Sequence, residues 1–112
     1  MQMRDFSYVD DCIEALLLAA TSETANGKVY NLGGLEVINL RDLAVLMTKQ
    51  GYGGSFKLVP FPDDRKVIDI GNYYADFSLI GKELGWVPRV GLYEGLTKTL
   101  QYYDEHGKHY WD

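Results

Sequence analysis

The sequence is poor in cysteine and has no long apolar run. One cysteine, Cys12, in 112 residues excludes an internal disulfide framework and any zinc site built from several cysteines. The longest apolar run, residues 15–20, is far shorter than the roughly 20 residues that span a bilayer. The first residues also lack the pattern of a secretory signal peptide. We therefore expect a cytoplasmic protein that has no membrane partner.

Positive charge is also scarce. Lys and Arg number 11 against 16 Asp and Glu, which gives a formal net charge of −5. Proteins that bind nucleic acid usually carry a basic face that neutralises phosphates, so we expect no nucleic-acid partner. A hydrophobic fraction of 46% argues against general disorder. The length suits one modest domain, because two domains would each need on the order of 100 residues.

Two signatures of redox catalysis are missing from the sequence. No G-x-G-x-x-G loop follows a predicted strand, so the glycine-rich phosphate cradle of a dinucleotide-binding domain is absent. No tyrosine has a lysine four residues later, which excludes a phenol activated by a lysine one helical turn away. His106 and His109 have no evident third partner, so no metal site is expected. We predict that this chain holds no cofactor and no catalytic residue.

Hydrophobic spacing predicts a small mixed domain. Helices are expected from residue 12 to about 21, over 40–50, over 77–84 and over 91–107, and short strands over 6–9, 28–32 and 56–59. Asp11 and Glu14 resemble a capping box, Asn39 is a good N-cap, and Gly85 and Gly107 are expected to end helices. The predicted fold class is α/β, an α+β-like small domain with about four helices and three short strands.

Three motifs in order resemble one enzyme family. Residues 4–11 read R-D-F-S-Y-V-D-D, residues 29–34 read V-Y-N-L-G-G, and residues 69–86 end in I-G-K-E-L-G-W. These segments are similar to the extended short-chain dehydrogenases, the NAD-dependent nucleotide-sugar epimerases and dehydratases. Leu79 stands where the closing family motif has lysine. The resemblance covers almost the whole chain but only the C-terminal third of the family.

This resemblance implies a single C-terminal nucleotide-sugar-binding subdomain over residues 1–112, without the Rossmann half. NAD and the catalytic Tyr-x-x-x-Lys pair would lie in a missing N-terminal Rossmann domain, so the chain alone is expected to be inactive. In the intact enzyme, NAD would oxidise the sugar, with C4 the usual site. The expected ligand is a UDP- or dTDP-sugar. Whether the chemistry is that of an isomerase, a lyase or an oxidoreductase stays open.

The resemblance also implies the substrate-binding residues. Arg4 matches the family arginine that reaches the diphosphate, a task suited to a bidentate guanidinium. Asp69 matches the carboxylate that contacts the ribose, and Tyr73 the residue that borders the sugar. A second cation usually precedes that carboxylate by three residues, which is Lys66 here, although Arg65 is preferred for its geometry. Which of these two cations faces the phosphates stays open.

A different class of function also fits the composition. The chain could be a non-catalytic module that uses this fold for protein contacts or self-association. Its acidic, tyrosine-rich surface would then bind a partner or a second copy. Binding of nucleoside diphosphates separates the two hypotheses, because an interaction module would ignore them.

Overall fold

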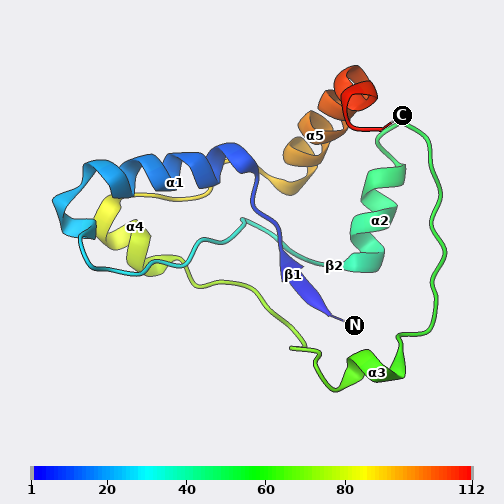
Figure 1. Ribbon diagram of the computed structural model, residues 1–112, viewed down its shortest axis with the longest axis horizontal. Helices are drawn as coiled ribbons and strands as arrows, with labels where there is room; N and C mark the ends of the chain where they lie inside the picture. Colours follow the sequence, from blue (N-terminus) through cyan, green and yellow to red (C-terminus); the bar gives the residue numbers. More distant parts are fainter. Residues whose placement is uncertain (1, 112) are drawn as a thin grey trace.

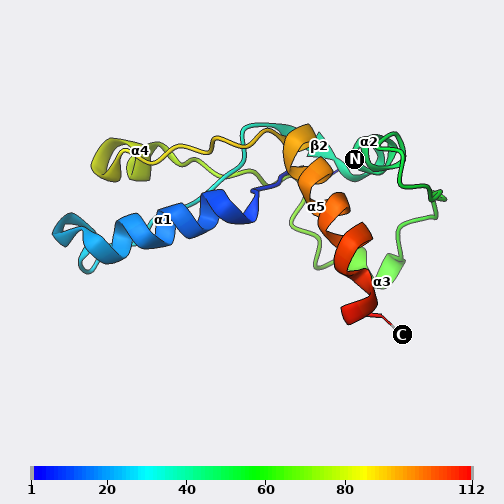
Figure 2. The ribbon, with the colours of Figure 1, turned by 90° about the horizontal axis from the view of Figure 1, so that it is seen from above.

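The computed structural model describes residues 2–111, arranged as two groups of helices joined by a short sheet (Figure 1). In chain order the elements are β1 (Met3–Asp5), α1 (Val9–Thr21), η1 (Glu23–Ala25), β2 (Val37–Asn39), α2 (Leu40–Thr48), α3 (Asp63–Lys66), α4 (Ser78–Leu84), α5 (Leu92–His106) and η2 (Gly107–His109). Helices α1 and α4 lie at one end, and α2, α3 and α5 lie at the other (Figure 2). No helix within residues 2–111 is both long and apolar enough to span a bilayer.

The sheet brings together segments that are far apart in the sequence. Strand β1 pairs antiparallel with β2, and Arg4 lies opposite Ile38. Tyr73 adds a single parallel bridge to Arg4, with its backbone N–H donating to the Met3 carbonyl at 2.9 Å. Two three-residue strands make a marginal sheet by themselves. The sheet therefore serves mainly to hold the loop around Tyr73 against β1.

The buried core lies between α1 and α4. Among residues 2–111, Ala15, Ile80 and Trp86 form the buried hydrophobic core, and Trp86 is 1% exposed. The rings of Phe77 and Trp86 meet edge to face with centroids 5.9 Å apart, a favoured aromatic geometry. Gly85 ends α4 in the left-handed conformation at φ +71°, which confirms the predicted stop.

The prediction that Asp11 caps the first helix is wrong. Helix α1 begins at Val9, which places Asp11 inside the first turn, and this residue is only 4% exposed. Its carboxylate accepts hydrogen bonds from the backbone N–H groups of Arg89 and Val90, at 3.1 to 3.2 Å. Its carbonyl accepts the indole N–H of Trp86 at 2.9 Å. The Asp11 carboxylate thus satisfies part-buried backbone donors of a distant segment, because those N–H groups have no helix or sheet partner.

The three predicted strands are also wrong in detail. The first strand lies at Met3–Asp5 rather than at 6–9, and within residues 2–111 neither 28–32 nor 56–59 belongs to a sheet. Val29 is 86% exposed in its extended segment. A strand exists only where a neighbour completes its ladder, and the described residues offer none to these segments. The long loop over 60–72 contains the short helix α3 instead.

The helices of the other end follow the sequence closely. The Asn39 side chain accepts from the Asp42 N–H at 2.9 Å, which confirms the predicted N-cap of α2. Helix α5 runs from Leu92 to His106 and stops at Gly107, as expected. Local signals decide these boundaries because caps and glycine stops act within a single turn.

Replacing Asp11 by Asn is expected to lower the free energy of unfolding by about 2 kcal/mol. The change keeps the shape but removes the charge that strengthens the hydrogen bonds to Arg89 and Val90. Urea unfolding followed by circular dichroism measures this loss. Asp10→Asn, at an exposed neighbouring position, is the matched control. Equal losses in the two variants would contradict the assigned role.

Candidate functional site

The Asp5 carboxylate fixes the frame of the site. One of its oxygens accepts the N–H groups of Gly34, at 3.2 Å, and Ala75, at 3.1 Å. A Cβ on Gly33 would lie 2.7 Å from this oxygen, and one on Gly34 would lie 2.4 Å from the Phe6 carbonyl oxygen. The glycine pair is therefore required here, because any side chain would push these backbones apart.

Arg4 anchors the loop that follows Asp69. Its Nη1 donates to the Met3 carbonyl at 2.8 Å and to the Gly71 carbonyl, and its Nη2 donates to Gln2 Oε1 at 3.4 Å. A guanidinium has five N–H donors, so these bonds occupy a large part of its capacity. Arg4 thus holds residues 69–73 beside β1. Its contact with a diphosphate stays a prediction.

Asp69 is held in its ionised form. Hydrogen bonding to the Gln2 side chain lowers its pKa below the usual 3.8, followed by the Gly71 N–H and the positive charge of Arg4. The Gly71 N–H lies 3.0 Å from Asp69 Oδ1. The donors favour the charged form, so the carboxylate stays a hydrogen-bond acceptor at neutral pH and at moderately acidic pH. Such a group suits the hydroxyls of a ribose.

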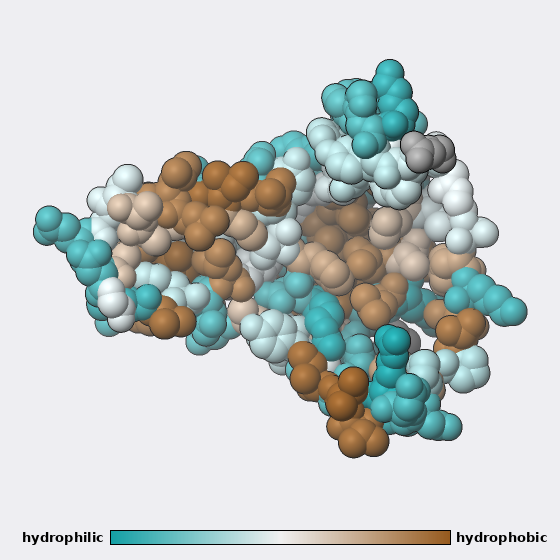
Figure 3. Space-filling view, in the orientation of Figure 1, coloured by the Kyte–Doolittle hydropathy of each residue, from teal (hydrophilic) through white to brown (hydrophobic). Residues whose placement is uncertain are grey.

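A cavity of about 470 Å³ opens beside this loop. Its lining residues are Gln2, Leu40, Arg41, Leu58, Phe61, Lys66 and Asp69. Ligand pockets for small molecules commonly measure about 300–1,000 Å³, and they combine apolar walls with a few placed polar groups. In the space-filling view, apolar surface gathers between β1 and α2 and, separately, over α1 (Figure 3). The cavity is the candidate ligand site.

Two of the five predicted site residues line the cavity, and the other three lie outside its lining. Lys66 and Asp69 line the cavity, and Lys66 also pairs with Asp63 at 2.6 Å in an exposed contact that contributes little. Arg65 lies beside Lys66 on α3 but is not part of the lining. Arg4 and Tyr73 lie outside the lining and form a backbone bridge with each other, and Tyr73 is 52% exposed. The cavity lining thus favours Lys66 over Arg65 as the cation that meets a ligand.

Sequence reasoning missed Gln2, Arg41 and the apolar wall. Arg41 lies in the first turn of α2, two residues after the predicted cap Asn39. A signal for it existed, since a cation at the start of a helix opposes the helix dipole and so suggests a role other than helix stability. Leu58 and Phe61 carry no comparable signal, because only the folded loop brings them to the cavity.

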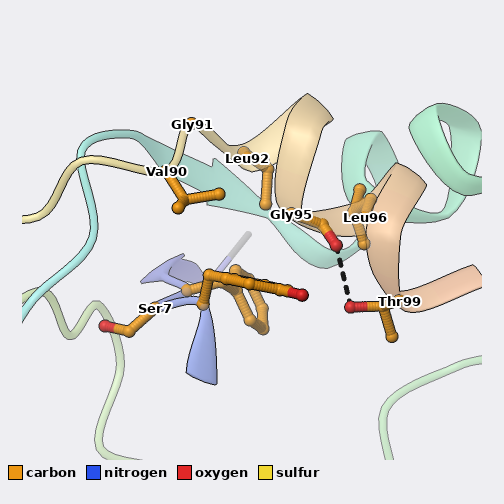
Figure 4. Close-up of a pocket in the computed structure, with 9 residues that line it drawn as sticks. Ser7, Val90, Gly91, Leu92, Gly95, Leu96 and Thr99 are labelled. Atoms are coloured by element: carbon orange, nitrogen blue, oxygen red, sulfur yellow. Dashed lines mark hydrogen bonds between the residues drawn. The ribbon is translucent and has the colours of Figure 1, made fainter. Parts of the chain in front are cut away.

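A second, smaller cavity of about 160 Å³ lies where the link between β1 and α1 meets the start of α5 (Figure 4). The Thr99 hydroxyl donates to the Gly95 carbonyl at 2.8 Å on its rim. A Cβ on Gly95 would lie 3.2 Å from the Tyr8 ring, so this glycine lets α5 pack closely on Tyr8. Within residues 2–111, no charged side chain lines this cavity, which makes it a poor site for an anion.

The described residues show no group of three metal-ligating side chains. His106 Nδ1 lies 3.0 Å from the Tyr102 carbonyl, so its ring is engaged within α5. The expectation of no metal stays a prediction.

Known proteins resemble this chain over most of its length. The family described as GDP-mannose 4,6 dehydratase matches residues 1–99. A dTDP-glucose 4,6-dehydratase from Streptomyces griseus is 31% identical over 112 residues, which cover 100% of this chain and 33% of the relative. UDP-D-apiose/UDP-D-xylose synthase 1 of Arabidopsis thaliana is 29% identical, and the match covers 88% of this chain and 28% of that relative. The chain thus spans about a third of the length of these curated relatives.

Solved structures share its fold. UDP-glucose 4-epimerase of Thermotoga maritima, solved with UDP-glucose, has a TM-score of 0.79 and 28% identity over 93% of this chain and 32% of its own. UDP-glucuronic acid 4-epimerase of Bacillus cereus, solved with NAD, has a TM-score of 0.75 and 28% identity over the same shares of the two chains. The small α+β architecture is therefore part of a larger known fold.

Removing the Gln2 side chain is expected to raise the pKa of Asp69 toward 3.8, because its hydrogen bond is the largest cause of the lowered value. The pH titration of the Asp69 carboxyl ¹³C shift in Gln2→Ala measures this change. The stability that ionised Asp69 contributes is present above about pH 4 and is lost as the pH falls through its lowered pKa. Gln101→Ala, on α5, is the control. An unchanged Asp69 titration would show that Gln2 does not act on it.

Proposed function

Because the chain belongs to the GDP-mannose 4,6-dehydratase family, within the NAD-dependent epimerases and dehydratases, we propose that it binds the nucleotide-sugar of such an enzyme. Its fold matches a C-terminal portion of the extended short-chain dehydrogenases. The observation that carries the proposal is the cavity of about 470 Å³ that exposes Lys66 and Asp69 beside apolar walls. A cation for phosphate, a carboxylate for ribose and an apolar surface for a base are the three recognition elements that a nucleotide needs.

The proposed ligand is a UDP- or dTDP-sugar, because relatives are named for dTDP-glucose and one solved neighbour contains UDP-glucose. Lys66 would bind the phosphates and Asp69 a ribose hydroxyl. Arg4 would keep the loop in place, because its guanidinium is bonded to Met3, Gly71 and Gln2. Tyr73 would border the sugar.

The residues of this chain do not fit NAD. Among residues 2–111, no strand is followed by a G-x-G-x-x-G loop, the pattern that lets a backbone approach a pyrophosphate. The NAD-containing neighbour has a chain about three times longer. We propose that NAD and the oxidation of the sugar belong to the rest of the enzyme, and that this chain supplies substrate binding alone.

An exposed apolar stripe supports a missing partner domain. Val9, Ile13, Leu16 and Leu17 follow one face of α1 and are 47 to 67% exposed. The extended segment 28–32 also lacks a strand partner in the described part of the chain. An apolar face beside an unpaired strand suits the edge of an α/β sheet, so the Rossmann domain is the proposed cover. The same stripe favours self-association as the second candidate function.

Lys66→Ala is expected to weaken binding of UDP or dTDP by about tenfold, or about 1.4 kcal/mol, because one charged phosphate contact is lost. Isothermal titration calorimetry measures the dissociation constants. Arg65→Ala should raise the dissociation constant less than threefold, and Lys108→Ala, far along the chain, should leave it unchanged. A larger loss of nucleotide affinity in Arg65→Ala than in Lys66→Ala would show that Arg65 is the cation that binds the phosphates. Absence of nucleotide binding in the unaltered chain would overturn the proposed function.

Backbone amides of residues 29–32 are expected to exchange at least about 100-fold more slowly in the complete enzyme than in this chain alone, because a sheet would protect them. Hydrogen exchange followed by mass spectrometry measures this. Equally fast exchange in both would argue against docking on a sheet. Protection that grows with the concentration of the isolated chain would instead support self-association.

A further inference from the structure

Arg41 lines the candidate cavity. It is the second residue of α2, which follows directly on β2, the partner strand of β1. Its nearest acid in sequence, Asp42, is engaged with Asn39, whose Nδ2 donates to Asp42 Oδ2 at 2.7 Å. None of the ion pairs formed within residues 2–111 involves Arg41. Its guanidinium is therefore available to a ligand.

The charges around the cavity favour an anionic ligand. Arg41 and Lys66 supply two cations and Asp69 one carboxylate, so the lining carries one net positive charge. The chain as a whole carries −5. Clustering of cations on the wall of a pocket in an acidic protein raises the local potential for anions. A phosphate group would enter this cavity more readily than a neutral sugar would.

The positive end of α2 adds to this potential. Leu40 and Arg41 begin the helix and both line the cavity. The first backbone N–H groups of a helix have no partner within the helix, and the dipole is positive at that end. Asn39 satisfies the N–H of Asp42 and leaves the N–H groups of the two lining residues without a bond from the cap.

The guanidinium of Arg4 is bonded to Met3, Gly71 and Gln2, and it is not part of the cavity wall. Lys66 can offer only a point charge, whereas a guanidinium binds two phosphate oxygens at once. We propose that Arg41 binds the diphosphate of the nucleotide-sugar together with Lys66, one cation from α2 and one from α3. This inference rests on the proposed function and adds to it a specific binding residue.

The test compares four forms of the chain by calorimetry: unaltered, Arg41→Ala, Arg41→Lys and Lys49→Ala. Lys49 lies at the opposite end of α2 and serves as the matched control. UDP and dTDP are the probes, and uridine and thymidine report on the part of the site that lacks phosphate. Arg41→Ala should weaken diphosphate binding at least tenfold and leave nucleoside binding within twofold. Arg41→Lys should lose about three- to fivefold, and Lys49→Ala should bind normally.

Each outcome decides the matter. Unchanged diphosphate binding in Arg41→Ala, with binding intact in the unaltered chain, would overturn the role of Arg41 and leave the proposed function standing. Equal loss of nucleoside and diphosphate binding would assign Arg41 a structural role and would also overturn the inference. If the unaltered chain binds neither UDP nor dTDP, the proposed function fails and the inference fails with it.

Discussion

The Asp5 carboxylate is the interaction on which the site depends. It accepts backbone N–H groups from Gly34 and Ala75, and so joins β1, the glycine pair and the segment before α4. The loop that carries Asp69 runs into that segment and is held again by Arg4 at Gly71. Because charged acceptors form stronger hydrogen bonds than neutral ones, one carboxylate can hold three segments that share little apolar contact.

Polar ties of this kind matter because the apolar core is small. Ala15, Ile80 and Trp86 are its buried residues, while the outward stripe of α1 is exposed. Asp11 ties α1 to the segment before α5, as Asp5 ties the sheet to the loop. The proposed Rossmann partner would cover this exposed stripe. The cavity lies away from that stripe, on the side of α2 and α3.

Local signals in the sequence predicted the helices and the family, but not the contacts between segments. Asn39 and Gly85 act within one turn, so the start of α2 and the end of α4 were predictable. The family motifs around Arg4 and Asp69 led to the correct family, which the match over residues 1–99 confirms. The segment 28–32 has the composition of a strand, but no described segment pairs with it. Strand pairing depends on tertiary contacts, which local sequence does not predict. Asp11 was misread because its hydrogen-bond partners lie in a distant segment, and Arg41 was missed because only the folded chain places it on the cavity.

The most direct test of nucleotide binding is to locate the nucleotide by backbone amide NMR. UDP, dTDP, GDP and CDP are each titrated into the isotope-labelled chain. Substrate binding at the cavity predicts saturable shifts at residues 40–42 and 65–71, with UDP or dTDP stronger than GDP and CDP. Dispersed signals that no nucleotide shifts, or shifts confined to the aromatic end of α5, would contradict it.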